Sequence, residues 1–277
     1  MTDHAGAAAS AATTPELRVE RRGPALWVWI NREARRNAMN AAVLGGIAAA
    51  LDTAAADPQV RAVVLTGTGD KAFCAGADLS EGTGTFRSGP DVAGPAAEDP
   101  TTDFGRLARA VRRCGVPLIA RVNGACVAGG MGLMALCDLA VAAEHARFGL
   151  PEVKVGVFPM QVLVLLRATM HQRHINELCL TGELIPAVRA AELGLINEVA
   201  PAGELDARVE ALLAKLRAAS PSAVRRGKQA LFAMEVMAFD QAISYAEAQI
   251  GQASRSADAE EGLAAFNEKR KPRWATD

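Results

Sequence analysis

The feature that most constrains the fold is an apolar run at residues 60–66 (VRAVVLT), which follows a stretch rich in alanine and leucine at residues 40–56. The Ala/Leu-rich stretch predicts a helix that ends at Asp57-Pro58, since proline disfavours helical backbone in the residue before it. The β-branched run is bounded by glycines and predicts a buried strand. A buried strand after a helix indicates a βαβ unit, and therefore a parallel sheet.

The rest of the chain divides into a mixed part and a helical part. We expect a disordered tail at residues 1–14, an α/β core at residues 15–200, and a helical region at residues 201–277. The polar segment at residues 80–102 is a long loop of the kind that is usually functional or mobile. From residue 159 onward the pattern is helical, with helices expected at residues 161–170, 174–180, 187–193, 205–219, 222–237, 239–251 and 258–271. The other predicted elements are a β-hairpin (17–22 and 25–30), strands at 116–122 and 139–143, a helix at 103–113, and a turn at 148–152 that leads into 153–158.

Composition excludes several classes of function. The net charge is −1, with acidic and basic residues mixed along the chain, so neither nucleic acid nor a membrane is expected as a partner. The five cysteines are scattered without a C-x-x-C pair, which favours reduced thiols over a metal site. No signal peptide or membrane-length apolar run is visible, and a cytoplasmic enzyme is expected.

A glycine-rich turn follows the second apolar strand. Residues 123–132 (NGACVAGGMG) are small, and the sequence then continues as LMAL with no helix breaker. Glycine has no Cβ, so a ligand can approach its backbone closely. The first N–H groups of a helix lack internal partners and favour negative charge. This turn is therefore predicted to meet a negatively charged group.

A second small-residue turn, CAGAD at residues 74–78, also follows a parallel strand. Both turns would lie at the carboxyl edge of the sheet, where ligands usually bind. Two converging N–H donors, one from each turn, would form an oxyanion hole for a carbonyl that takes on negative charge. The alternative is that both are only tight turns.

Glu152 follows the apolar sequence FGLP at residues 148–151. Desolvation in such surroundings would raise the pKa of its carboxyl group toward that of a useful general base. The alternative is a solvated loop carboxylate. Asp138, at the start of a strand, is predicted to be a structural hydrogen-bonding group.

The motifs AFCAGADL, VNGACVAGGMGLMALCDLAVA and ARFGLPEVKVGVFP occur in this order, with RNAMN before them and EGLAAFNEKRKP after them. From about residue 17 to residue 274 the chain thereby resembles the enoyl-CoA hydratase/isomerase family, the crotonases. The resemblance implies a spiral of ββα turns with C-terminal helices that assemble into trimers and often hexamers. It also implies an acyl-CoA thioester substrate, with coenzyme A as part of the substrate and no further cofactor.

The resemblance also implies roles for individual residues. The N–H groups of Ala77 and Gly129 would form the oxyanion hole for an enolate, and Glu152 would be the acid/base. Phe266 and Lys269 would reach the CoA of a neighbouring subunit, although simple helix packing and a solvated face would also account for them. The positions implied to line the CoA path are Ala38, Lys71, Ala75, Asp78, Leu79 and Gly130.

One position departs from the family pattern. Hydratases of this family use two glutamates, and the first of them corresponds to Gly132 here. Moving a double bond between the 3,4 and 2,3 positions needs only one base, so a single glutamate favours an isomerase. Other family members with this glycine carry hydratase labels, and a loop carboxylate (Glu81, Glu98, Asp99 or Asp103) could serve as the partner. Both reactions therefore stay open.

Two other classes of function compete with these enzymes. The missing glutamate suggests a non-catalytic acyl-CoA-binding homologue. The spacing Gly130-x-Gly132-x-x-Ala135, with Glu152 further on, also satisfies a dinucleotide-binding pattern and suggests an NAD-dependent oxidoreductase. The helix predicted there, however, is short for a crossover helix.

Overall fold

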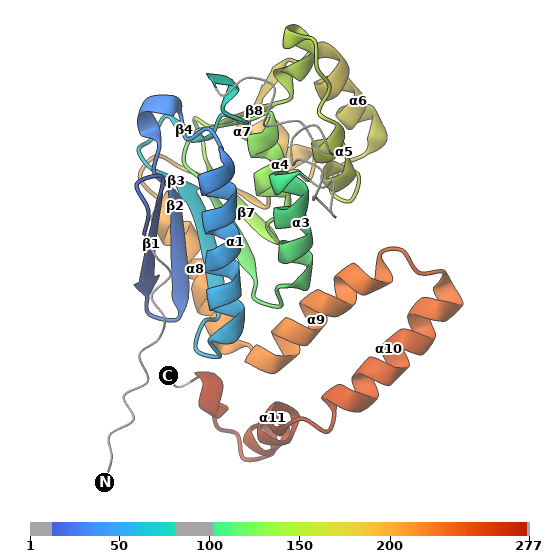
Figure 1. Cartoon of the computed structure of the whole chain (residues 1–277). Coiled ribbons are helices and arrows are strands. Elements are labelled where there is room, and N and C mark those ends of the chain that lie inside the picture. Colours follow the sequence, from blue (N-terminus) through green and yellow to red (C-terminus); the bar gives the residue numbers. More distant parts are fainter. Residues whose placement is uncertain (1–12, 81–101, 276–277) are drawn as a thin grey trace, which may run out of the picture.

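The computed structural model describes residues 13–80 and 102–275, and its largest element is a six-stranded sheet (Figure 1). The first two strands are antiparallel, and every later neighbour is parallel, which confirms the predicted βαβ arrangement. In spatial order the strands are β1 (Leu17–Arg22), β2 (Ala25–Ile30), β3 (Ala62–Gly67), β5 (Leu118–Val122), β7 (Leu139–Ala143) and β10 (Glu198–Ala200).

A second, four-stranded sheet carries the turns of interest. Its strands are parallel except for the last, which is antiparallel to its neighbour. Each strand is only three residues long, too short to show a periodic pattern in the sequence. In spatial order they are β4 (Ala72–Cys74), β6 (Ala125–Val127), β8 (Arg147–Gly149) and β9 (Leu184–Pro186).

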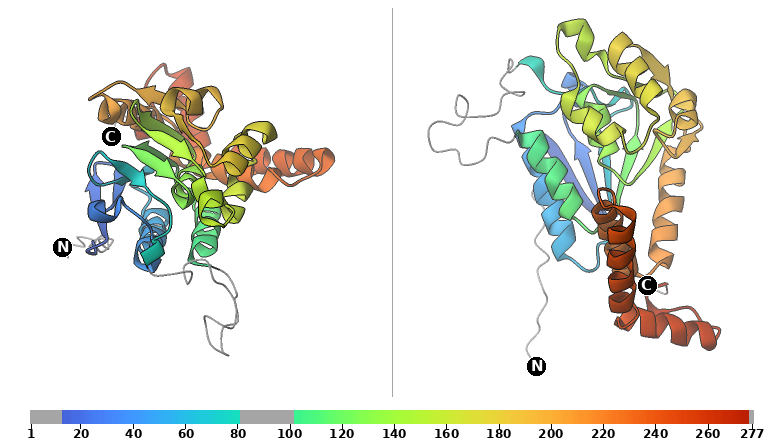
Figure 2. Two further views of the ribbon diagram at one scale, coloured as in Figure 1. Left: turned by 90° about the horizontal axis from the view of Figure 1, so that it is seen from above. Right: turned by 90° about the vertical axis from the view of Figure 1, so that its right-hand side faces the viewer.

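Helices cover both faces of the large sheet (Figure 2, right). On one face lie α1 (Ala41–Ala56) and α3 (Asp103–Arg113), and on the other lies α8 (Leu205–Ala218). The Asn40 side chain caps α1 by accepting a hydrogen bond from the Val43 N–H at 3.0 Å. The core is therefore two apolar layers, one on each side of the sheet.

Short helices surround the small sheet at the top of the molecule (Figure 1). The turn predicted at residues 148–152 is instead the end of strand β8 followed by the start of a 3-10 helix. Two short strands, β9 and β10, lie between the helices predicted after residue 159. The helices here are α4 (Gly129–Ala135), α5 (Met160–Leu166), α6 (Gln172–Thr181) and α7 (Ala187–Glu192), with the 3-10 helices η1 (Glu33–Arg35) and η3 (Pro151–Val155).

The last helices extend away from the sheets (Figures 1 and 2). They are α9 (Pro221–Met234), α10 (Phe239–Ala253) and α11 (Ala257–Asn267), followed by the 3-10 helix η4 (Arg273–Ala275). The parallel α/β core followed by helices agrees with the predicted fold class. The predicted disordered tail lies almost wholly outside the described residues, as does most of the predicted long loop. None of the described helices is both long and apolar enough to cross a membrane.

Polar contacts fasten α9 to the core. Lys228 is buried, donates to the Val116 carbonyl at 2.8 Å, and pairs with Asp138 at 2.7 Å. Asp138 also accepts a hydrogen bond from the Leu118 N–H at 2.7 Å, which confirms its structural role. The Arg225 guanidinium donates to carbonyls at the end of α1 and in the following turn.

Replacing Lys228 with methionine is expected to lower the free energy of unfolding by about 2–3 kcal/mol, because Asp138 would lose its cation in a partly buried site. Urea denaturation of both proteins measures this difference. Lys215→Met on the exposed side of α8 is the matched control and should change stability little. An unchanged unfolding midpoint for the Lys228 variant would show that the pair contributes nothing.

Candidate active site

Two turns that are far apart in the sequence touch at the ends of β4 and β6. Gly76 follows β4 and has φ +97°, a backbone conformation that favours glycine. A Cβ at Gly76 would lie 2.9 Å from the Ala128 Cβ and 3.3 Å from the Gly129 nitrogen. A glycine is therefore required for the close approach of the two turns.

The close approach brings two N–H groups together. Met39 forms an isolated parallel bridge with Ala77, in which the Met39 N–H donates to Gly76 and the Asp78 N–H donates to Met39. The bridge leaves the N–H of Ala77 itself without an acceptor among residues 13–80 and 102–275.

The Gly129 N–H likewise has no acceptor in the described part of the chain. A Cβ on Gly129 would lie only 3.7 Å from the Ala77 nitrogen, so the two donors are neighbours. Adjacent unpaired N–H groups form the arrangement that stabilises an oxyanion.

Glu152 follows the strand that lies next to the second of these turns. Strand β8 pairs with β6 so that Gly149 is opposite Val127, and Glu152 follows in η3. Its Oε2 atom is buried without a hydrogen-bond partner in the described residues. Burial raises the pKa of the Glu152 carboxyl group. An unpartnered carboxylate with a raised pKa can take up and return a proton.

The thiol of Cys179 on α6 lies near Glu152. Burial, and then the charge of Glu152, raises the pKa of Cys179 to about 11, so the thiol stays neutral. The wall next to the carboxylate is therefore uncharged on this side. The sequence did not predict that Cys179 would lie near Glu152, because helix α5 separates η3 from α6 along the chain.

The position of Gly132 is closed by apolar side chains. A Cβ at Gly132 would lie 2.9 Å from the Phe104 ring and 3.0 Å from Val162 Cγ2. Phe104 on α3 and Val162 on α5 thus occupy the space into which a side chain at position 132 would project. Neither residue was identified as a site residue from the sequence, because each is distant from Gly132 along the chain.

Of the loop carboxylates predicted as possible partners, Asp103 is described and is paired with Arg106 on the first turn of α3. The other three, Glu81, Glu98 and Asp99, lie outside the described residues.

Most of the residues predicted to line the CoA path lie with Ala77 along the bridge between the two chain segments, namely Ala38, Ala75, Asp78 and Leu79. The side chains of Leu79 and of Lys71, another of the predicted residues, are exposed. Gly130 instead faces β4, since a Cβ there would overlap the Cys74 carbonyl. The geometry therefore gives Gly130 a packing role between α4 and β4.

Asp78 is engaged inside the protein. Its carboxylate accepts hydrogen bonds from the Ser80 hydroxyl at 2.6 Å and the Ser80 N–H at 3.0 Å, and pairs with Arg32 at 2.7 Å. Arg32 also donates to the Ala38 carbonyl at 2.6 Å. Arg32 and Asp78 therefore clamp together the two segments that hold Ala77. Arg32 was not singled out from the sequence, because it lies 46 residues from Asp78.

The clamp predicts a pH dependence of stability. Hydrogen bonds from Ser80, with the Arg32 guanidinium, lower the pKa of Asp78 to about 2. A carboxyl group with a lowered pKa stabilises the fold above its unfolded value of about 3.9, and this stabilisation is lost as pH falls toward 2.

Asp78→Asn should therefore remove part of the fall in melting temperature over this acid range, as followed by circular dichroism. Asp52→Asn on the exposed face of α1 is the control. Identical acid profiles for the Asp78 variant and the unaltered protein would contradict the prediction.

Phe266 and Lys269 do not join the site within one chain. Both lie at the end of α11, at the opposite end of the molecule from β4, β8 and α4 (Figure 1). The Phe266 side chain is exposed. The dinucleotide pattern is also unsupported, because Gly130 and Gly132 lie on a seven-residue helix and Glu152 lies in a 3-10 helix rather than at a strand end.

Comparison with known proteins gives one consistent result. The protein-family model described as "Enoyl-CoA hydratase/isomerase" matches residues 24–277 of this chain. A putative enoyl-CoA hydratase of Thermus thermophilus is 36% identical over 247 residues, covering 89% of this chain and 96% of that protein. The 2,3-dehydroadipyl-CoA hydratase of Escherichia coli is 33% identical over 261 residues, covering 93% and 97%.

Solved structures agree with the sequence comparison. An enoyl-CoA hydratase of Mycobacterium smegmatis superposes with a TM-score of 0.83 at 33% identity, covering 94% of this chain and 99% of that one. An enoyl-CoA hydratase/isomerase from Marinobacter aquaeolei gives a TM-score of 0.85 at 31% identity, covering 95% and 100%.

Proposed function

The chain belongs to the enoyl-CoA hydratase/isomerase family, and from this premise we propose that it adds water to the 2,3 double bond of an enoyl-CoA thioester. The observation that carries the proposal is the buried, unpartnered Oε2 of Glu152, just after the strand that pairs with β6, together with the unpaired N–H groups of Ala77 and Gly129. Relatives named as hydratases support hydration as the reaction.

In the proposed reaction, water attacks C3 while Glu152 takes one of its protons. The electrons of the double bond move toward the thioester, whose oxygen becomes an enolate oxygen held by the N–H groups of Ala77 and Gly129. C2 then takes the proton from Glu152, and the carboxylate is restored. The sum is one water molecule added across the double bond, and these groups require no further cofactor.

Isomerisation of a 3-enoyl-CoA to the 2-enoyl-CoA is the second candidate. The apolar side chains of Phe104 and Val162 next to Gly132 favour it, because they fill the space that a second acid/base at position 132 would need and leave Glu152 to move the proton alone. Glu152 would then take a proton from C2 and return it to C4.

One assay separates the candidates. Incubation with 2-enoyl-CoA should reduce the absorbance of the conjugated thioester as the hydrated product forms. Appearance of that absorbance from 3-enoyl-CoA would instead identify an isomerase. Absence of both reactions, in a protein that still binds acyl-CoA, would leave a non-catalytic binder and overturn the proposal.

The residues at Gly132 give a further prediction. Gly132→Glu alone should lower the melting temperature, because the new Cβ would lie 2.9 Å from the Phe104 ring. Gly132→Glu combined with Phe104→Ala should make room for a second carboxylate and raise hydration relative to isomerisation by about tenfold or more.

Phe104→Ala alone is the control, since it opens the space without adding an acid. If the ratio of hydration to isomerisation is the same in Phe104→Ala and in the double variant, position 132 has no role in choosing the reaction.

We also propose that the C-terminal helices assemble the chain into a trimer or hexamer, with Phe266 and Lys269 meeting the CoA of a neighbouring subunit. In support, these helices and their connections expose large apolar side chains, namely Leu231, Val236, Phe239, Ile243, Ile250, Leu263 and Phe266. Such surface is typical of an interface. Sedimentation or mass photometry would determine the number of subunits.

A further inference from the structure

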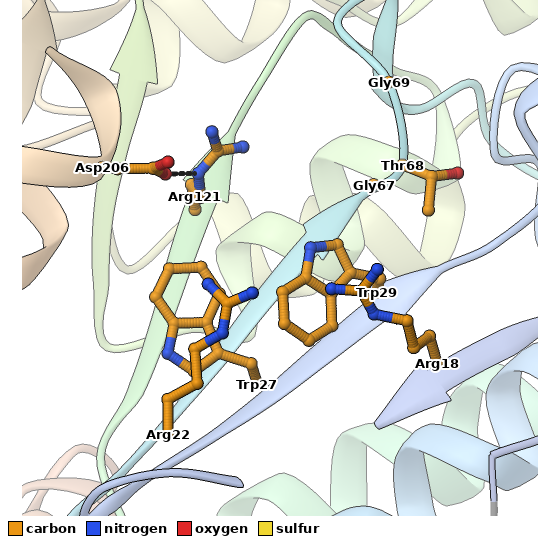
Figure 3. Close-up of a pocket in the computed structure, with 9 residues that line it drawn as sticks. All are labelled: Arg18, Arg22, Trp27, Trp29, Gly67, Thr68, Gly69, Arg121 and Asp206. Atoms are coloured by element: carbon orange, nitrogen blue, oxygen red, sulfur yellow. Dashed lines mark hydrogen bonds and ion pairs between the residues drawn. The ribbon is translucent and has the colours of Figure 1, made fainter. Parts of the chain in front are cut away.

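A cavity lined by arginines and tryptophans lies apart from the Glu152 site. It has a volume of about 390 Å³ and opens on the α8 side of the large sheet, at its β1–β2 edge (Figure 3). This volume lies within the range of small-molecule sites. Its lining is unusual for a sheet surface: three arginines, two tryptophans and one aspartate, namely Arg18, Arg22, Arg121, Trp27, Trp29 and Asp206, with the backbone of residues 67–69.

The two tryptophans form a platform for two of the arginines. Trp27 and Trp29 stack with ring centroids 5.4 Å apart. The Arg18 guanidinium lies 4.1 Å from the Trp29 ring, and that of Arg22 lies 4.7 Å from the Trp27 ring. Glu20, between them on the same face of β1, binds both arginines. The guanidinium groups are therefore held in fixed positions over the indoles.

The lining has more donors than acceptors. Three arginines and one aspartate line the cavity, and Arg121 pairs with Asp206 at 2.5 Å. The carboxylates of Glu20 and Glu33 lie next to the cavity without lining it, Glu20 against Arg18 and Arg22 and Glu33 against Gly69. Several guanidinium N–H groups have no acceptor among the described residues.

Trp27 forms part of the floor of the cavity. The residue is 2% exposed, so the indole ring is held firmly by the core beneath it. The indole N–H is buried below the surface and is not available to a molecule in the cavity. The groups that can meet a ligand are therefore the guanidinium N–H donors above the indole rings.

We propose that this cavity binds a small organic oxyanion, a phosphoester or carboxylate of metabolite size, through Arg18 and Arg22, with its organic body against the tryptophan rings. Guanidinium groups pair with such oxyanions through parallel N–H donors. The cavity is larger than an inorganic ion needs, so the anionic group carries an organic body. The site is separate from Glu152 and the oxyanion donors, which lie at the small sheet.

Tryptophan fluorescence can test the proposal directly, because the chain has only three tryptophans. Trp274→Phe leaves Trp27 and Trp29 as the reporters. Titration with phenyl phosphate, benzoate and inorganic phosphate, with benzyl alcohol as the neutral probe, should give a saturable change for an organic anion alone. Phenyl phosphate and benzoate distinguish a phosphoester site from a carboxylate site.

Variants of β1 supply the control. Arg18→Gln with Arg22→Gln should weaken binding of the better probe at least tenfold. Arg21→Gln, which lies on the other face of β1 and pairs with Asp57, should leave it unchanged. Circular dichroism spectra confirm that the variants are folded.

Three results would overturn the proposal: no saturable change with any anion, an equal change with benzyl alcohol, or equal affinity in the double variant. Displacement of the probe by saturating acyl-CoA would overturn the separation from the active site.

Discussion

Replacing Glu152 with glutamine is expected to lower kcat by about 10²–10⁴-fold while acyl-CoA binding is retained. The amide has nearly the shape of the carboxylate but cannot take a proton from water or from C2. The loss should therefore appear in kcat, and an equilibrium measurement such as calorimetry should give a similar dissociation constant for a saturated acyl-CoA. Glu177→Gln, exposed on α6, is the control.

The raised pKa of Glu152 adds a pH signature to this result. The carboxylate must be ionised to act as a base, so kcat/KM should rise with pH through a value above the ordinary 4.5 of glutamate. The glutamine variant should lack this rise. Full activity in the variant, or an unchanged pH profile, would remove Glu152 from the mechanism.

Replacing Gly76 with alanine is expected to lower kcat by about 10²–10³-fold, comparable to the loss of one oxyanion donor. The φ of +97° strains any residue with a Cβ, and that Cβ would press on Ala128 at 2.9 Å. Both effects move the Ala77 N–H away from the Gly129 N–H. Steady-state kinetics with 2-enoyl-CoA measures the change.

Gly203→Ala is the matched control for Gly76→Ala. It also has a positive φ, +78°, but a Cβ there meets nothing within 4 Å. It shares the backbone strain without the displacement of the two turns. Similar kcat values for both alanine variants would show that the contact at Ala128 does not position the donors.

The sequence predicted those parts of the molecule that leave a local pattern. The run at residues 60–66 covers β3 except for its last residue, and the Ala/Leu stretch before it contains α1, because apolar periodicity and a proline stop are short-range signals. The three-residue strands of the small sheet could not be found in this way. Each of them pairs with a strand that is distant in the sequence, and the rest of the fold brings the two strands together.

The same distinction applies to the candidate site. Glu152, Ala77 and Gly129 could be predicted as site residues because they lie in short motifs that resemble those of a known family. Phe104 and Arg32 were not, because a contact with Gly132 or Asp78 across many residues has no signature in a single sequence. Their roles depend on side-chain packing, which only the folded chain defines.

The bridge between Met39 and Ala77 has a consequence for how the site tolerates change. In this pairing the neighbours of Ala77 use their polar groups to hold the two segments together, and its own N–H is left over. The N–H group that we propose as an oxyanion donor at this position is therefore set by the path of the backbone, and no particular side chain is needed to provide it. Among the twenty amino acids only proline lacks this hydrogen, so the chemistry here depends on topology more than on residue identity.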